Sequence, residues 1–433
     1  MTKRSDKYLW CVGSKPPPID PHSQVKHQIV QRYLERYVHV LMSNFLMEKL
    51  TLSIVDGFAG GGEYSSDDGT EYYDGSPLIA LRTIREQEAI MNVGRTKQRR
   101  IDARYYFVEK LKPHFDYLEH LLSARLPAER FGNDVFLFEN AFQNVVDNVI
   151  QDIRRRAGGE RAIFLLDQYA YDQVPAPLLK KIFNEVKGAE VILTFNVDSL
   201  ISFLSDTKIS RKKLDETGLS RYIDWDGLQA LKDQGPMVWR AAIQRNLARG
   251  LIESSGALHY TIFYITPMGS TPWTYWLIHL SNSYKARDVM MELHWEMANH
   301  FSHYLEPDIY SLNLGYQAKS DSNATRQIEF DLGEAHYFDE VASRKTSSGL
   351  TQKLIPAIYD SGESRPFGHW LETIGSSTPA TAGMIRQALD PGIRSGDIIA
   401  RSKDGALRKR GGSLKPTDIL SPSSQRPFIF VPR

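Results

Sequence analysis

The sequence predicts an α/β fold built on a mostly parallel sheet, with a helical insertion and a smaller domain after it. Two observations support this prediction. Short apolar runs typical of strands alternate with helical segments through five strands in residues 52–195, and this order builds parallel sheets. Two further strands, 258–265 and 273–280, are joined by residues 266–272 alone. That connection is too short for a crossover helix, so these two strands must be antiparallel.

Composition limits the function classes. A chain of 433 residues suggests two or three domains. Its 53 basic and 52 acidic residues nearly cancel, so any binding of nucleic acid must come from a local patch. Cys11 is the only cysteine, which excludes an internal disulfide and a cysteine-held zinc or iron–sulfur site within this chain. With no apolar signal core and no run of 18 apolar residues, we expect a cytoplasmic protein without a membrane contact.

The N-terminal region predicts an arm followed by a helix. Residues 1–22 are polar and rich in proline, which is typical of an extended arm. Residues 23–45 carry apolar side chains at helical spacing, so we expect a helix before the first strand. Lys26 and His27 of this helix either face a ligand at the sheet edge or lie on its solvated face, and the solvated face is the preferred interpretation.

The stretch 52–62 is the strongest local signal. It is an apolar run that ends at Asp56 and continues into Gly60, Gly61 and Gly62, as expected for a buried strand that enters a ligand loop. Glycines allow a sharp turn and a close approach of a ligand to the backbone, although a glycine turn can also simply end a strand. The acidic and aromatic residues 63–74 predict a solvated loop or substrate lid rather than a metal site.

Further strands and helices follow in alternation. The strand 103–109 ends at Glu109, where nucleotide-binding sheets carry a ribose-binding carboxylate. The helix over 139–153 ends in Arg154, Arg155 and Arg156 before two glycines, so these arginines are interpreted as caps rather than as a nucleic-acid site. The remaining elements of this region are predicted as strands at 134–138, 161–167 and 190–195, a helix at 174–186, and a helical insertion at 199–257.

The C-terminal region differs in character. We expect a helix over 285–304 and a linker or accessory segment over 311–365, so that the main domain spans 23–310. Residues 366–433 combine a helix at 379–389 with strand-like runs at 396–400 and 427–431, which suggests a winged-helix-like domain. Basic side chains of its turn could hold phosphates of DNA or RNA, or could be a solvated wing: Arg401, Lys403, Arg408, Lys409, Arg410 and Lys415.

The motifs resemble those of methyltransferases. Phe58-x-Gly60-x-Gly62 is similar to the signature of amino-methyltransferases that act on nucleic acid. Five alternating strands and a final hairpin are the strand sequence of the Rossmann-like methyltransferases, whose seventh strand runs backwards between two neighbours. The resemblance therefore implies a seven-stranded sheet and S-adenosylmethionine as the cofactor.

A second resemblance is more specific. Lys26-His27, residues 56–60, residues 75–77, Glu109 and residues 166–169 together resemble the three-Cys-motif partner family, over about residues 20–305. These are bacterial proteins often encoded beside a radical-type three-cysteine protein. The resemblance implies such a partner protein, but the family's chemistry is poorly defined, so it says more about fold and cofactor than about substrate.

Residue roles follow from these resemblances. The backbone of Gly57 to Gly62 would approach the methionine part of the cofactor, Asp56 its ammonium group, and Glu109 its ribose hydroxyls. Asn140 and Ala141 would read the adenine. The resemblance thus assigns these residues to the cofactor: Asp56, Gly57, Phe58, Ala59, Gly60, Gly62, Glu109, Asn140 and Ala141.

The acceptor end of the site departs from the family pattern. Asp167 and Tyr169 fall where amino-methyltransferases carry Asp-Pro-Pro-Tyr, and they could orient an amine or stack an aromatic group. The two prolines are absent, because Gln168 and Ala170 stand in this loop. A less rigid loop puts base methylation in doubt.

Two functions remain open at the level of sequence. The first is an S-adenosylmethionine-dependent methyltransferase that acts on nucleic acid or on a partner-presented substrate. The second is a non-catalytic module that binds cofactor or a partner, within a phage-defence or mobile-element system. Other chemistries lack their motifs, because no phosphate loop, no cysteine nucleophile after the fourth strand and no Gly-x-Gly-x-x-Gly turn is present. No metal site is expected.

Overall fold

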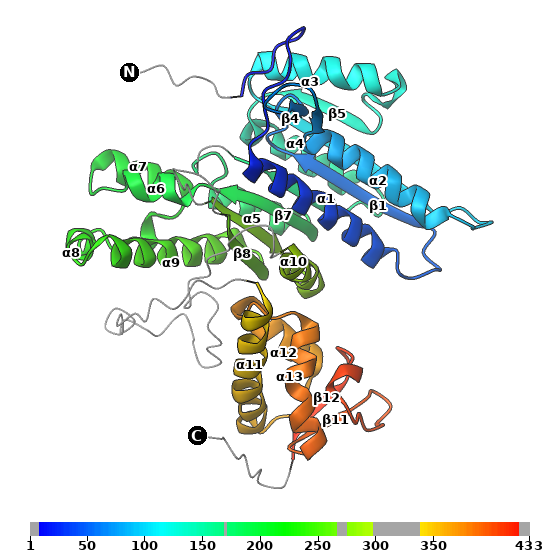
Figure 1. Ribbon diagram of the computed structural model, residues 1–433, viewed down its shortest axis with the longest axis vertical. Coiled ribbons are helices and arrows are strands. Elements are labelled where there is room, and N and C mark those ends of the chain that lie inside the picture. Colours follow the sequence, from blue (N-terminus) through cyan, green and yellow to red (C-terminus); the bar gives the residue numbers. More distant parts are fainter. Residues whose placement is uncertain (1–7, 169–170, 266–274, 298–337, 424–433) are drawn as a thin grey trace. The chain divides into compact units, whose positions relative to one another are not determined.

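The structure is a computed structural model that describes residues 8–168, 171–265, 275–297 and 338–423 (Figure 1). The chain divides into two compact units, Met1–Val289 and Met290–Arg433. Each unit is described by itself.

The first unit is built on a seven-stranded sheet within the described residues, in the order β5-β4-β1-β6-β7-β9-β8. The first five of these strands are parallel, whereas β9 is antiparallel to both of its neighbours, β7 and β8. This order confirms the predicted mostly parallel sheet with a reversed strand near one edge, which is the topology of Rossmann-like methyltransferases. The strands are β1 (Lys49–Asp56), β4 (Arg100–Glu109), β5 (Val135–Glu139), β6 (Arg161–Leu166), β7 (Gly188–Phe195), β8 (His259–Ile265) and β9 (Tyr275–Ser281).

The central strands are buried on both faces. Seven of the eight residues of β1 are buried, as expected for a parallel strand covered by helices on both sides. The register aligns Asp56 with Phe107 of β4 and with Leu165 of β6. The carboxyl ends of these strands therefore lie at one edge of the sheet.

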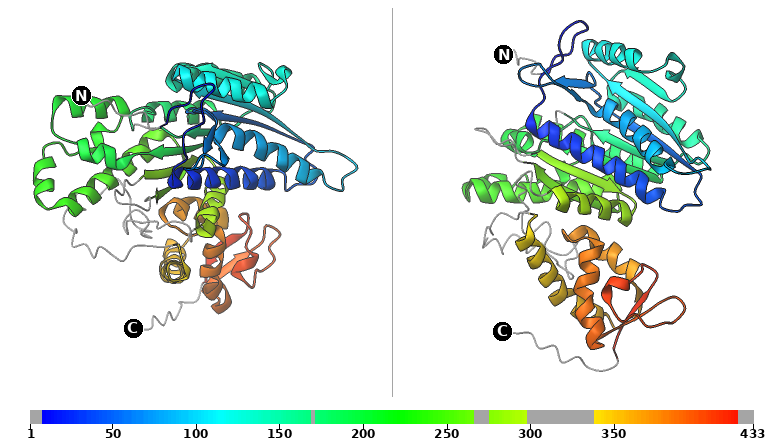
Figure 2. Two further views of the ribbon diagram at one scale, coloured as in Figure 1. Left: turned by 45° about the horizontal axis from the view of Figure 1, so that its top comes forward. Right: turned by 45° about the vertical axis from the view of Figure 1, so that its right-hand side comes forward.

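Helices cover both faces of the sheet. Helices α1 (Pro21–Leu41) and α2 (Ser76–Asn92) pack against each other, and Figures 1 and 2 show them side by side over the sheet. The strand order reverses direction after β5, so right-handed crossovers place α4 (Phe142–Arg155) and α5 (Ala176–Glu185) on the opposite face. Helix α3 (Lys112–Arg125) follows β4, and a short helical turn η1 (Ala128–Arg130) follows α3.

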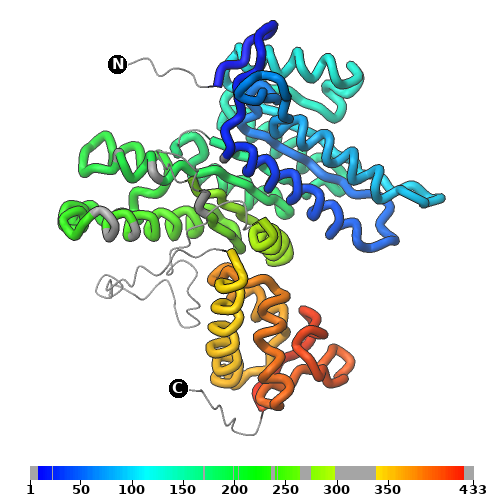
Figure 3. The backbone as a smooth tube through the Cα atoms, in the orientation of Figure 1, coloured from blue at the N-terminus to red at the C-terminus, as the bar shows by residue number. Residues whose placement is uncertain are grey.

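The arm is fixed to a small hairpin. The 63–74 stretch, expected as a loop or lid, contains strands β2 (Glu63–Ser65) and β3 (Tyr72–Asp74). Residues 17–19 of the arm run beside β2, because Ile19 N–H donates to Ser65 O and Ser65 N–H donates to Pro17 O, both at 3.0 Å. Figure 3 shows the path of this arm into α1.

The region predicted as a helical insertion is helical. It holds α6 (Val197–Phe203), α7 (Lys208–Thr217), η2 (Ser220–Tyr222), α8 (Leu228–Asp233) and α9 (Pro236–Ser255). Helix α10 (Tyr284–Met297) follows β9, and the division between the two units falls within it.

The second unit combines helices with a small antiparallel sheet of order β10-β12-β11 in its described part. Its helix α11 spans part of the segment that the sequence pattern suggested as a linker or accessory piece, and it packs on α13. The predicted strand at 427–431 lies outside the described residues, and the last described strand is β12. The elements are α11 (Glu340–Ser361), β10 (Arg365–Pro366), α12 (Phe367–Ile374), η3 (Gly375–Ser377), α13 (Ala382–Ser395), β11 (Ile398–Arg401), η4 (Gly411–Ser413) and β12 (Ile419–Pro422).

Among the described residues, no helix has the length and apolar character that crossing a membrane requires.

Candidate functional site

The candidate site lies at the carboxyl edge of the parallel strands, where open α/β sheets bind their ligands. Backbone hydrogen bonds hold the loops of this edge together. Gly57 N–H donates to Leu165 O of β6, and Ala59 N–H donates to Val108 O of β4, both at 3.0 Å. Asn140 N–H donates to the carbonyl of Glu109, also at 3.0 Å. The structure thus brings the predicted residues from β1, β4 and β5 into one place.

The glycine turn contacts the carboxylate of the next strand directly. Gly60 and Gly62 have φ angles of 57° and 85°, in the left-handed region that side chains with a Cβ rarely adopt. Gly60 N–H donates to Glu109 Oε2 at 3.0 Å. The turn and Glu109 therefore converge on one point, as the sequence predicted.

Glu109 is nearly buried, with 9% of its surface exposed. Its Oε1 accepts the Leu111 N–H at 2.7 Å and lies 3.8 Å from His114 Nδ1. Each carboxylate oxygen has two lone pairs, so these two backbone bonds leave capacity for hydroxyl donors. Glu109 is accordingly held in place while it retains the ability to accept hydrogen bonds from a ribose.

Asp56 is a buried carboxyl group, and one of its oxygens has no hydrogen-bond partner in the described part of the chain. It is 1% exposed, its Oδ1 accepts the Phe58 N–H at 3.1 Å, and its Oδ2 has no hydrogen bond within the described residues. Burial raises the pKa of Asp56 to about 7, against the opposing effect of hydrogen bonds from the Ser76 hydroxyl and the Phe58 N–H. A buried carboxyl oxygen without a partner suits a cationic ligand group, because such a group would satisfy it and favour its ionised form.

The remaining predicted cofactor residues surround this point. The ring of Phe58 lies 6.3 Å from the ring of Phe142 at the start of α4. Asn140 Oδ1 accepts the Ala141 N–H at 2.8 Å, and Asn140 is exposed. Gly62 closes the turn, since its carbonyl accepts the Gly75 N–H at 2.8 Å before α2 begins.

Asp167, the predicted acceptor residue, is held by a lysine. Lys26 Nζ of α1 lies 2.7 Å from both carboxylate oxygens of Asp167. Desolvation opposes ionisation of Asp167, but the Lys26 ammonium outweighs it and keeps the pKa of Asp167 below its ordinary value. The side chain of Lys26 is 11% exposed. Lys26 therefore faces the sheet edge, and the preferred interpretation of it as part of a solvated helix face was wrong.

The rest of the acceptor loop is described in part. Tyr169, the second predicted acceptor residue, lies outside the described residues. Gln168 is 2% exposed, and its Oε1 accepts the Val174 N–H at 2.9 Å. This bond ties the loop to the segment before α5, a role that proline could not fill.

The arm contributes a residue that the sequence reasoning missed. Trp10 is 4% exposed, and its indole N–H donates to Glu63 O at 2.7 Å. A Cβ added at Gly61 would lie only 2.1 Å from Trp10 Cδ1, and one added at Gly60 would lie 3.2 Å from Trp10 Cη2. The same indole packs edge-on against His114, with ring centroids 4.9 Å apart. Trp10 is thus a wall of the site, and the absence of side chains at Gly60 and Gly61 makes room for it.

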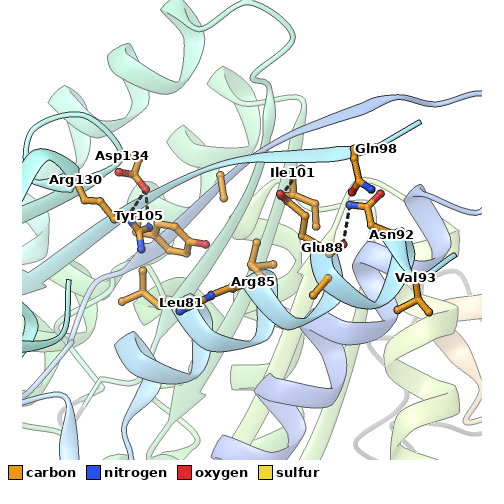
Figure 4. A pocket seen from close by; sticks show the side chains of 13 residues that line it. Leu81, Arg85, Glu88, Asn92, Val93, Gln98, Ile101, Tyr105, Arg130 and Asp134 are labelled. Carbon is orange, nitrogen blue, oxygen red and sulfur yellow. Dashed lines mark hydrogen bonds and ion pairs between the residues drawn. The ribbon is translucent and has the colours of Figure 1, made fainter. Parts of the chain in front are cut away.

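A separate cavity of about 570 Å³ lies beside α2, toward the amino ends of the strands (Figure 4). Several of its polar groups bind one another or the backbone. Arg130 forms an ion pair with Asp134 at 2.6 Å, and Glu88 Oε2 accepts the Ile101 N–H at 2.7 Å. This cavity is therefore a weaker candidate than the carboxyl edge.

The basic residues predicted to contact nucleic acid lie in the second unit, in and after β11. Arg408 forms an ion pair within the second unit, because its Nε and Nη2 donate to the buried Asp418 at 2.8 and 3.1 Å. Arg401 Nη1 donates to Gly405 O at 3.1 Å. Within the described residues, the side chains of the other four are exposed and make no ion pair or hydrogen bond: Lys403, Lys409, Arg410 and Lys415.

Comparison with known proteins gave matches among solved structures only; no protein-family model and no curated protein sequence matches the chain. A Legionella pneumophila protein, LPL1258, is 12% identical with a TM-score of 0.38, over 63% of this chain and 91% of that one. An rRNA methylase from Streptococcus thermophilus is 11% identical with a TM-score of 0.27, over 59% and 94% of the two chains. TYW2 from M. jannaschii, in complex with AdoMet, is 10% identical with a TM-score of 0.25, over 61% and 76%. These identities are low, and the fold assignment rests on the strand order, which is that of Rossmann-like methyltransferases.

Proposed function

We propose that the chain is an S-adenosylmethionine-dependent methyltransferase that acts on nucleic acid or on a substrate presented by a partner protein. Two observations carry this proposal: the contact between Gly60 N–H and Glu109, and the buried oxygen of Asp56 that has no hydrogen-bond partner in the described part of the chain. Both occur at the edge where this strand order binds ligands.

The residues present fit the cofactor. The unpartnered carboxyl oxygen of Asp56 could accept a hydrogen bond from an ammonium group. The Glu109 carboxylate, which the Leu111 N–H holds in place, could accept hydrogen bonds from ribose hydroxyls. The turn from Gly57 to Gly62 would lie along the methionine part, and Asn140 with Ala141 would lie beside the adenine. When bound, the cofactor supplies an electrophilic methyl group, and the protein contributes positioning and exclusion of water.

At the acceptor end, Asp167 and Tyr169 are the proposed residues that orient the substrate. Lys26 already occupies both oxygens of Asp167. An incoming amine would therefore share Asp167 with Lys26, and we infer that Lys26 keeps this carboxylate ionised and fixed before the substrate enters.

The same ion pair favours a second candidate function. A carboxylate that is fully engaged by a lysine, in a loop without the two prolines, also suits a protein that binds its cofactor or partner without catalysis. Under this alternative the chain is a three-Cys-motif partner-like binding module that associates with a radical-type three-cysteine protein in a phage-defence or mobile-element system.

A contact with DNA or RNA through the second unit is part of the proposal. The element order α11-β10-α12-α13-β11-β12 supports a winged-helix-like arrangement. In it, the turn after β11 presents Lys403, Lys409 and Arg410 to phosphates, whereas Arg408 stabilises the turn through Asp418.

Calorimetry tests the cofactor claim. S-adenosylmethionine and its demethylated product are titrated into the wild type, Glu109→Gln and Glu139→Gln. Glu139 is the matched control, because it ends the neighbouring strand in register with Glu109 but is exposed. We expect the Glu109→Gln substitution to weaken binding at least about tenfold, the effect of losing one charge-assisted hydrogen bond, and the control to bind as the wild type does.

Labelled methyl transfer to DNA, RNA and the neighbouring gene product then separates the two functions. Transfer to any of them supports the enzyme. Cofactor binding without methyl transfer supports the non-catalytic binding module. If the wild-type protein does not bind the cofactor, both the methyltransferase and a cofactor-binding module are overturned.

A further inference from the structure

A second cavity lies at the opposite edge of the sheet. It measures about 710 Å³ and opens at the amino ends of β6 and β7. Two tight turns form it, one from α4 into β6 and one from α5 into β7, and they are joined by a hydrogen bond from Gly188 N–H to Glu160 O at 3.1 Å. The charged side chains that line it are Arg154, Arg155, Arg156, Glu160, Arg161 and Lys187.

Two of these cations stabilise the fold. Arg156 is 7% exposed and lies 2.6 Å from Asp102, while its Nη1 donates to Leu52 O at 2.8 Å. It joins the turn to β1 and β4. Arg154 lies 3.3 Å from Glu185 of α5.

The other three cations make no contact of this kind. Arg155, Arg161 and Lys187 are exposed, and within the described residues none of them forms an ion pair with a carboxylate. As the sequence pattern predicted, α4 ends at these arginines, with Arg154 and Arg155 in its last turn and Arg156 at its C-cap. None of the three side chains is hydrogen-bonded to a carbonyl of α4 in the described part of the chain. The interaction of the cations with the two helix ends that lie here is worth only about 0.3–1 kcal/mol each at an exposed site.

The charge is notable because the chain as a whole is almost neutral, with a net charge of +1. Glu160 is the single acidic residue in the lining. Arginine side chains bind phosphate oxygens through paired N–H groups, and lysine binds them as a point charge. The three exposed cations can therefore contact more than one phosphate group.

We propose that this basic cavity binds the phosphate backbone of a nucleic acid through Arg155, Arg161 and Lys187. The site is distinct from the cofactor edge and does not depend on methyl transfer. It would hold the backbone without reading its sequence, because contacts to phosphate oxygens carry no sequence information.

The test compares two triple variants. Arg155→Gln, Arg161→Gln and Lys187→Gln together remove the three cations while leaving Arg156 intact. The matched control replaces the exposed Lys208, Lys212 and Lys213 of α7 by Gln, which removes the same charge from the same unit. Binding of labelled single-stranded and double-stranded oligonucleotides is followed by fluorescence anisotropy between 50 and 200 mM salt, on the full chain.

Each phosphate contact contributes about 0.9 to the slope of log K against log salt for duplex DNA, and about 0.7 for single strands. We expect the cavity variant to reduce the slope by about 2 to 3 and the control to leave it within about 0.5. The single variant Arg155→Gln should reduce it by about 0.9 and serves if the triple variant does not fold. S-adenosylmethionine titrations should be unchanged in all of them.

Equal slopes for the cavity variant, the control and the wild type would overturn the proposal. Tripolyphosphate is the competitor that identifies the source of the phosphates. Displacement of the oligonucleotide by tripolyphosphate supports a shared phosphate site, whereas binding of tripolyphosphate with no binding of either oligonucleotide overturns the assignment to nucleic acid.

Discussion

Replacement of Asp56 by asparagine is expected to stabilise the protein and to weaken its cofactor binding at the same time. Burial raises the pKa of Asp56 from 3.8 to about 7. The unfolded chain releases this proton at a lower pH than the folded chain does, so wild-type stability falls as pH rises from about 4 to about 7 and is then constant. About three pH units at 1.36 kcal/mol each correspond to roughly 4 kcal/mol.

The Asp56→Asn substitution removes this pH dependence while its side-chain oxygen can still accept the Phe58 N–H. At pH 8 the variant should therefore be more stable than the wild type by up to about 4 kcal/mol, and near pH 4 the difference should vanish. Urea denaturation at pH 4, 6, 7 and 8 measures it. The matched control is Asp67→Asn, an exposed carboxylate of the β2–β3 turn, which should show no such trend.

Cofactor binding should change in the opposite sense. For a pKa of about 7 the ionised fraction of Asp56 rises from about 0.1 at pH 6 to about 0.9 at pH 8, so an ammonium group that binds the carboxylate should bind roughly tenfold more tightly at pH 8. Calorimetry of Asp56→Asn should show weaker binding without this pH dependence. If the stability of the variant depends on pH as that of the wild type does, burial does not raise the pKa of Asp56. If the substitution changes the stability but not the cofactor affinity, Asp56 does not contact the cofactor.

Three further predictions concern other contacts. Gly61→Ala should destabilise the first unit by at least 1–3 kcal/mol, because its Cβ would overlap the Trp10 indole. In a Trp10→Ala background this loss of stability should be smaller, and thermal denaturation of the four proteins of a double-mutant cycle measures the difference. Lys26→Met should raise the pKa of Asp167 above its low wild-type value, which NMR titration of the carboxyl carbon would detect, whereas an unchanged pKa would refute the ion pair. Asp418→Asn should destabilise the second unit near pH 7, since it removes the carboxylate that pairs with Arg408. The loss should become smaller as the pH falls below about 4, since the pKa of Asp418 is lowered in the folded chain, and denaturation curves of equal stability at pH 7 would contradict this.

The sheet was predictable from sequence because its signals are local and repeated. The central strands are continuous apolar runs, and β1 and β4 end in Asp56 and Glu109 at the one edge of the sheet where parallel strands place ligands. The antiparallel hairpin followed from the length of its connection alone. Helix α11 was harder to predict, because Pro356 lies inside it and its sequence is rich in polar residues. Both features are typical of a linker.

The candidate site was predictable where its residues belong to a motif or end a strand of the sheet, and not where they reach it from the arm or from α1. Asp56 to Gly62 form one motif, so their proximity needs no tertiary information. Trp10 contacts Glu63, which is 53 positions later, and Lys26 contacts Asp167, which is 141 positions later. In a single sequence, nothing links a tryptophan in a polar arm, or a lysine on an amphipathic helix, to a partner so distant.

The position of Trp10 has a practical consequence for anyone who prepares this protein. Trimming a proline-rich leader to the start of its first helix is a common way to improve crystals. Here that truncation would strip the indole from the glycine turn and expose the backbone beneath it. If a shortened version failed to take up a ligand, the cause could be the loss of Trp10 rather than the absence of a binding site.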